Sequence, residues 1–188
     1  MAMLGGAFRC ITPYFRGKSK MTFAITEDIE RPPNTVDGAV YGWMDPVDGE
    51  PENGAHPLAF DVVGKYLLGK LTLPMIREIK LCACARELTS FDSESEFDAA
   101  GTVFAPEYFS PIGVLRDEQR DARALFNGRV LETCEFQNAL VGRRYRWVLV
   151  KTYGGLVDVV FDPEQIAVVP QIGGIIKGSF HLFGHVEV

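Results

Sequence analysis

Apolar and polar residues alternate along most of the chain after Ala122, with the period of two that indicates β-strands. Three stretches carry the pattern, over residues 124–138, 143–153 and 156–162. The middle stretch is rich in aromatic and β-branched residues, which favour strands. The pair Gly154-Gly155 predicts a tight turn between the last two stretches. The pattern therefore predicts a C-terminal half that is nearly all β.

The closing stretch, "GGIIKGSFHLFGHVEV" (residues 173–188), alternates as well. Its apolar series is Ile176, Gly178, Phe180, Leu182, Gly184, Val186 and Val188. The other series holds His181 and His185, whose spacing of four would suit zinc on a helix. On a strand, residues four apart lie ~13 Å from each other, too far for two ligands of one ion. The prediction is two strand histidines and no metal.

Before residue 122 the pattern is less regular. Residues 57–71 ("PLAFDVVGKYLLGKL") place apolar side chains at helical spacing and predict a helix. Residues 79–91 ("IKLCACARELTSF") alternate and predict a strand. The acidic stretch 92–101 ("DSESEFDAAG") is predicted to be a solvated loop, because it lacks the glycine and glutamate that an EF-hand needs at its sixth and twelfth positions.

The order of the C-terminal elements resembles a known small barrel. A strand with an internal glycine, a meander, a short crossing segment and the closing "GGIIKGSFHLFGHV" look like an OB-fold, over about residues 120–188. We therefore predict an α+β, mainly β protein. Its predicted parts are an N-terminal mixed α/β region over residues 1–115, with a flexible arm over 1–21, and an OB-like β-barrel over 116–188.

Charge is unevenly distributed along the chain. The net charge is −6, and residues 1–112 hold 10 Lys or Arg against 16 Asp or Glu, whereas residues 113–188 hold 9 of each. A general basic footprint for nucleic acid is therefore absent, and only a local patch would serve. An acidic N-terminal surface would suit an interaction or immunity-type protein that masks a basic partner.

The four cysteines, Cys10, Cys82, Cys84 and Cys134, are too scattered for a disulfide-stapled secreted fold, which favours a reduced, cytoplasmic protein. No apolar run approaches the ~20 residues of a membrane span, so no membrane partner is expected. We expect no cofactor. The oligomeric state stays open.

Motifs for catalysis are weak. "FRGKSK" ends like a phosphate-binding loop, but Thr12 stands where that motif needs its first glycine. Ser179 lacks the second glycine of a nucleophile elbow. A cysteine paired in space with a histidine stays open, so an enzyme or metal protein using His181, His185 and a cysteine is kept as an alternative.

The stretch "GRRYRWVLVKTYGG" is the most distinctive surface candidate. If Val148 and Val150 point into a barrel, the opposite face carries rings and cations that suit single-stranded nucleic acid, where bases stack on rings and cations hold phosphates. If Tyr145, Trp147 and Leu149 point inward, the same strand is ordinary core. The candidate ligand-binding residues are Arg143, Tyr145, Trp147, Lys151 and Tyr153.

The leading hypothesis is a non-enzymatic binding protein that uses this barrel to bind single-stranded nucleic acid or a partner protein. No catalytic or metal-binding residue is assigned.

Overall fold

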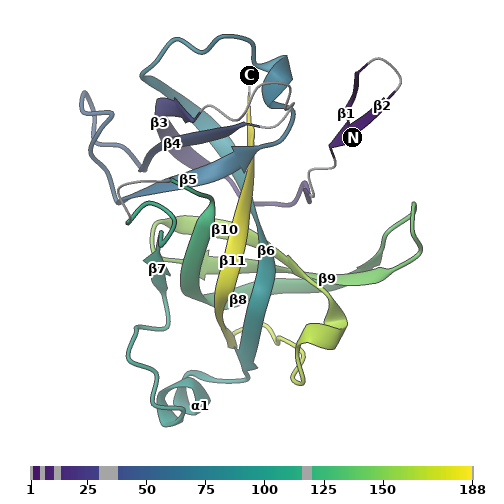
Figure 1. Cartoon of the computed structure of the whole chain (residues 1–188). Helices are drawn as coiled ribbons and strands as arrows, with labels where there is room; N and C mark the ends of the chain where they lie inside the picture. The colour runs from purple at the N-terminus through teal and green to yellow at the C-terminus, as the bar shows by residue number, and fades with distance from the viewer. Residues whose placement is uncertain (1, 5–6, 11–13, 30–37, 116–119, 188) are drawn as a thin grey trace.

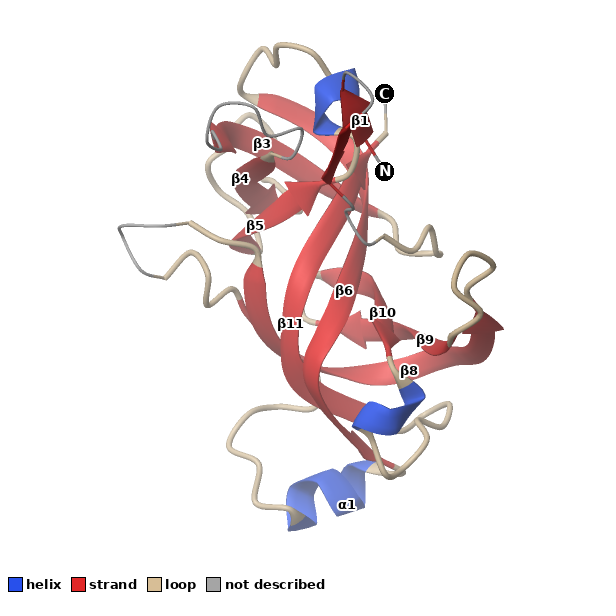
Figure 2. Ribbon diagram, turned by 45° about the vertical axis from the view of Figure 1, so that its right-hand side comes forward, coloured by secondary structure: helices blue, strands red, loops and turns tan. Residues whose placement is uncertain are grey.

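The structure is a computed structural model that describes residues 2–4, 7–10, 14–29, 38–115 and 120–187. It is mainly β, with 54% strand and 7% helix, as predicted. Figures 1 and 2 show most strands gathered around two long ones, β6 and β11, that run side by side through the molecule. The predicted boundary between 115 and 116 falls next to residues 116–119, outside the described part.

The strands fall into two sheets. A small sheet pairs β1 (Ala2–Leu4) with β2 (Ala7–Cys10). The large sheet has nine strands in the order β11-β5-β4-β3-β6-β10-β9-β8-β7, and β11 pairs additionally with β6 and β8. Its strands are β3 (Met21–Ile29), β4 (Ala39–Met44), β5 (His56–Val62), β6 (Met75–Phe91), β7 (Tyr108–Ser110), β8 (Arg123–Gln137), β9 (Arg144–Thr152), β10 (Gly155–Phe161) and β11 (Ile175–Val186).

The pairings close on themselves twice. The N-terminal circuit runs through β3, β4, β5, β11 and β6 and returns to β3. The C-terminal circuit runs through β8, β9, β10, β6 and β11 and returns to β8. Each half of the chain supplies an antiparallel three-strand meander, a 3₁₀ turn and one long strand. The two long strands pair with each other, so each completes the other half's circuit.

One core fills the space inside both circuits. It is lined by alternate residues of each strand, among them Phe23, Phe60, Leu81, Val148 and Phe180, each no more than 1% exposed. The predicted strand over 79–91 is confirmed, because Ile79, Leu81 and Ala83 point into this core. The apolar series of the closing strand is confirmed as far as Val186; Val188 lies outside the described residues.

Two local predictions are wrong. Residues 57–71 contain strand β5 and a 3₁₀ turn, Lys65–Leu67, in place of a helix. Leu58, Phe60 and Val62 also alternate, and pairing with β4 and β11 decided between the two periods. The acidic loop over 92–101 contains a short helix, α1 (Glu94–Ala99), because Ser93 caps its N-terminus and Phe97 is buried under it.

Candidate functional site

The basic–aromatic strand β9 points its valines inward. Val148 and Val150 are both fully buried in the core, so Trp147 and Leu149 point to the opposite, outer face of the C-terminal circuit. That outer face is not open along its whole length, because Trp147 and Leu149 are each only 5% exposed. The strand thus has one face in the core and a second face that another segment covers.

The covering segment is residues 14–20, which we call the arm. Phe15 lies over an aromatic cluster, with its ring centroid 5.7 Å from Trp147, 6.0 Å from Tyr145 and 5.5 Å from Phe136. The Lys18 ammonium lies 5.8 Å from the centre of the Trp147 ring, within range of a cation–π contact. The arm therefore shields the aromatic rings that the sequence placed on this strand.

Asp158 of β10 holds the arm in place. Its side chain is fully buried, and its carboxylate accepts hydrogen bonds from the backbone N–H groups of Lys18 (3.0 Å) and Ser19 (2.8 Å). The same carboxylate accepts a bond from the Trp147 indole N–H at 2.7 Å. A Cβ at Gly17 would lie 2.1 Å from an Asp158 oxygen, so only glycine allows this close approach. One buried carboxylate thus joins the arm to β9.

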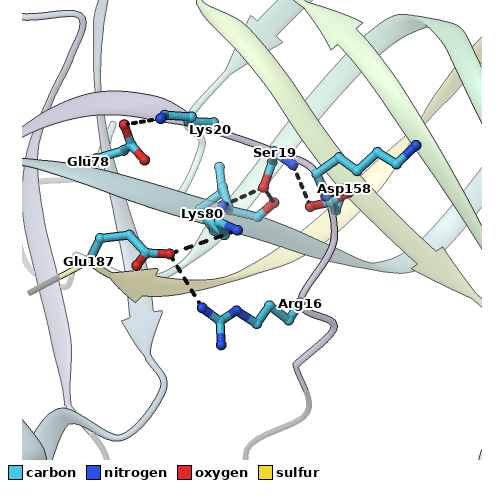
Figure 3. A network of polar contacts seen from close by, with 9 residues as sticks. Arg16, Ser19, Lys20, Glu78, Lys80, Asp158 and Glu187 are labelled. Atoms are coloured by element: carbon cyan, nitrogen blue, oxygen red, sulfur yellow. Dashed lines mark hydrogen bonds and ion pairs between the residues drawn. The ribbon is translucent and has the colours of Figure 1, made fainter.

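The rest of the arm is fixed by polar contacts, which Figure 3 shows. Ser19 Oγ donates to the Leu81 carbonyl and accepts from the Leu81 N–H, at 2.8 and 2.9 Å. Lys20 pairs with Glu78 at 2.7 Å. Glu187 lies 3.9 Å from both Arg16 and Lys80. Within the predicted flexible arm over 1–21, these residues are packed on the sheet, while residues 1, 5–6 and 11–13 lie outside the described part.

An open pocket remains beside the arm, at the loop end of the β8–β9 hairpin. Its volume is about 460 Å³, within the usual range for small-molecule sites. It is lined by Tyr14, Phe15, Cys84, Ala85, Asn138, Val141, Arg143, Arg144, Tyr145, Val160, Phe161, Asp162 and Gln165. Burial raises the pKa of both Tyr14 and Tyr145, so both hydroxyls stay protonated and able to donate.

Arg143 is the pocket's unpaired cation. Its guanidinium has no ion pair or hydrogen bond within the described part of the chain, whereas the Arg144 guanidinium lies 3.5 Å from Glu135. The Tyr14 hydroxyl is buried and likewise lacks a hydrogen-bond partner among the described residues. The pocket therefore combines four rings, those of Tyr14, Phe15, Tyr145 and Phe161, with a free guanidinium and a buried, unsatisfied hydroxyl.

The five predicted ligand-binding residues do not lie together. Arg143 and Tyr145 line the pocket, and Trp147 lies under Phe15. Lys151 pairs with Glu107 at 3.2 Å, at the other end of β9. Tyr153 is beyond it, 56% exposed, with its ring 6.1 Å from His56. The structure thus brings two of the five into one pocket.

Sequence reasoning missed Tyr14, Phe15 and Asp158. The tyrosine and phenylalanine belong to a segment whose glycines and prolines gave no period, so no pattern placed it on the sheet. Asp158 alternates with apolar residues in 156–162, as a solvated strand aspartate would. The available signal was local: two adjacent rings followed by "RGKSK", a run of cations with no acid.

The two strand histidines lie apart, as the spacing predicted. His181 bonds to Asp61 of β5 at 2.6 Å, and the His185 ring centroid lies 6.3 Å from Tyr14. Within the described ranges no group of three His, Cys, Asp or Glu residues is placed to hold a metal ion.

Comparison with known protein families, curated proteins and solved structures finds no match for this chain. Among the described residues, no helix is long and apolar enough to cross a membrane.

Proposed function

We propose that this chain is a non-enzymatic binding protein and that the pocket beside the arm binds single-stranded nucleic acid. The observation that carries the proposal is the pocket itself, where Tyr14, Phe15 and Tyr145 adjoin the unpaired Arg143. Rings in such a site stack on bases at about 1–3 kcal/mol each, and cations hold the phosphates. The volume suits a single nucleotide of a strand that continues past the pocket.

The strand arrangement supports the same proposal. We propose that the C-terminal circuit is a small barrel of the OB type, with β8, β9 and β10 as its first three strands. OB barrels bind oligonucleotides on the face of their second and third strands and at the loop between the first two. In this chain those places are β9, β10 and the β8–β9 hairpin, which together line the pocket.

A titration with fluorescently labelled, mixed-sequence single-stranded DNA and RNA at low salt tests the proposal. Replacing Trp43 by Phe leaves Trp147 as the only tryptophan, because the chain has two. We expect anisotropy to rise and Trp147 emission to change with the same midpoint. Flat signals up to high micromolar oligonucleotide for both DNA and RNA would end the nucleic-acid version.

Single substitutions assign the binding to the pocket. Y145A should weaken binding by about 1–3 kcal/mol through lost stacking. R143Q should weaken it and lower the slope of log affinity against log salt by about one contact. K177Q is the matched control, since it removes one exposed cation outside the pocket. Equal losses in R143Q and K177Q would point to non-specific attraction.

A partner protein is the second candidate, favoured by the tip of the β8–β9 hairpin. Leu140 is 94% exposed and Val141 67% exposed. The tip is held by Asn138, whose side chain accepts from the N–H groups of both residues. Because Leu140 does not line the pocket, L140S should leave oligonucleotide affinity unchanged under the nucleic-acid proposal.

A further inference from the structure

Cys84 is a thiol on the outer face of β6, at the wall of the pocket. It is partly exposed, and its neighbour in sequence, Ala83, is fully buried in the core. The residue directly opposite Cys84 on β11 is His181, whose neighbour Leu182 is also in the core. Cys84 and His181 therefore share one face as cross-strand neighbours, a pairing that puts their Cβ atoms about 5 Å apart.

The groups around Cys84 favour its thiolate. His181 is held by Asp61 at 2.6 Å, which orients the imidazole. The Cys82 thiol, two residues away on the same face, lowers the pKa of Cys84, and burial opposes this shift. The pKa of Cys82 is raised by its Cys84 neighbour and by burial, so the Cys82 thiol stays protonated.

The pocket in front of Cys84 carries positively charged side chains, which favour reagents that bear carboxylates. Arg143 and Arg144 both line it, and the Arg143 guanidinium has no hydrogen-bond or ion-pair partner among the described residues. Guanidinium groups recognise carboxylates through paired hydrogen bonds. Asp162 is the one acid in the lining, against the two arginines. The pocket therefore carries a net positive charge that suits a carboxylate, with the Cys84 thiol at its β6 wall.

We propose that Cys84 is a modification site that forms a mixed disulfide with small disulfides bearing carboxylates. His181 takes the proton from the Cys84 thiol, and the thiolate attacks one sulfur of the reagent. The new S–S bond forms as the reagent's own S–S bond breaks. The leaving thiolate carries away the electron pair and receives the proton from His181. The reagent disulfide is the oxidant, and one small thiol is released.

The chain contains its own reference thiols. Cys134 on β8 is exposed, and its sulfur donates a weak bond to the Glu135 carbonyl; it does not line the pocket. Cys82 is fully buried and reacts when the fold opens. Comparing the three separates pocket chemistry from exposure and from unfolding.

The experiment exposes the full chain to oxidised glutathione, which carries carboxylates, or to cystamine, which carries amines. Mass spectrometry of proteolytic peptides then gives the rate of adduct formation at each cysteine. We expect oxidised glutathione to modify Cys84 about fivefold faster than Cys134 or more, although Cys134 is the more exposed. If Cys134 reacts as fast as Cys84 or faster, the proposal is overturned.

Two variants separate the role of His181 as proton acceptor from the role of the arginines in recognising the carboxylates. H181Q should slow the reaction of Cys84 with both reagents, because the proton acceptor is lost. The double substitution R143Q/R144Q should slow only oxidised glutathione, by roughly three- to fivefold, the scale of exposed ion pairs. Unmodified Cys82 shows that a variant is still folded. If R143Q/R144Q slows oxidised glutathione and cystamine equally, the proposed selectivity for carboxylates is contradicted.

This inference goes beyond the proposed function and does not depend on it. If the chain does not bind oligonucleotides but Cys84 is modified selectively, only the nucleic-acid proposal is contradicted. If the chain binds oligonucleotides but Cys84 does not react, only the thiol proposal is contradicted.

Discussion

The two circuits use the same pairing scheme but have different outer faces. Asp61 and Asp158 occupy matching places: Asp61 of β5 is opposite Phe183 of β11, Asp158 of β10 is opposite Cys82 of β6, and both pairings are parallel. Phe183 and Cys82 are in turn partners of each other. Asp61 keeps a partly exposed side chain and holds His181, whereas Asp158 is fully buried and holds the arm.

The difference shows how one backbone scheme provides a site in only one half. On the N-terminal circuit, small residues such as Ala24 and Ala59 lie on the outer face of the strands beside half-exposed Tyr41 and Trp43. On the C-terminal circuit, the arm brings Tyr14 and Phe15 over the strands and leaves a pocket at its side. The site is therefore made by a segment that lies outside both circuits.

Substituting the two aspartates by alanine should give the largest contrast. D158A leaves two backbone N–H groups and one indole N–H unsatisfied in a buried place, which should lower the free energy of unfolding by about 3 kcal/mol. D61A removes a partly exposed partner of His181 and should cost about 1 kcal/mol. Urea denaturation measures the free energy of unfolding of both variants. If D158A lowers it no more than D61A does, the arm contributes little to stability.

Gly17→Ala should perturb the arm alone. The new Cβ would meet the Asp158 carboxylate at 2.1 Å, and overpacking of this kind costs about 1–3 kcal/mol. Lys20→Ala, in the same arm, removes only an exposed ion pair with Glu78 and should cost about 0.5 kcal/mol. We also expect G17A to raise acrylamide quenching of Trp147 in the Trp43→Phe background. Unchanged quenching would mean that Phe15 stays in place without the Gly17 contact.

The smallest effect concerns His56, where the two halves meet. Its ring stacks on Phe109 at 4.5 Å, and burial lowers its pKa below the ordinary 6.5, although carbonyls of Pro57 and Tyr153 oppose the shift. Protons therefore bind the unfolded chain more tightly, so stability should fall as the pH drops through 6.5. H56Q should flatten this part of the curve in urea denaturation at a series of pH values. An identical slope in H56Q would assign the loss to other groups.

The alternation of apolar and polar residues with a period of two made most of the strands predictable. The alternation over 79–91, 143–153 and 176–186 is the pattern that the core requires, and the inward direction of Val148 and Val150 was one of two interpretations that the sequence allowed. The helix predicted over 57–71 is wrong because Leu58 and Val62 fit both periods, and the partner strands that decide between them, β4 and β11, lie outside this stretch.

The candidate site was predictable only in part. Arg143 and Tyr145 stand out in the sequence because they interleave on one strand. Tyr14, Phe15 and Asp158 do not, because their roles depend on contacts between residues about 140 positions apart, as between Ser19 and Asp158.

The sequence by itself determined a mainly β chain, the alternating faces of β6 and β11, and the separation of His181 from His185, because side-chain direction follows from a period of two. The tertiary structure alone decided that β6 and β11 are shared by two circuits, that Cys84 faces His181, and that the arm covers Trp147. Those results depend on register and on long-range hydrogen bonds, which local patterns do not encode.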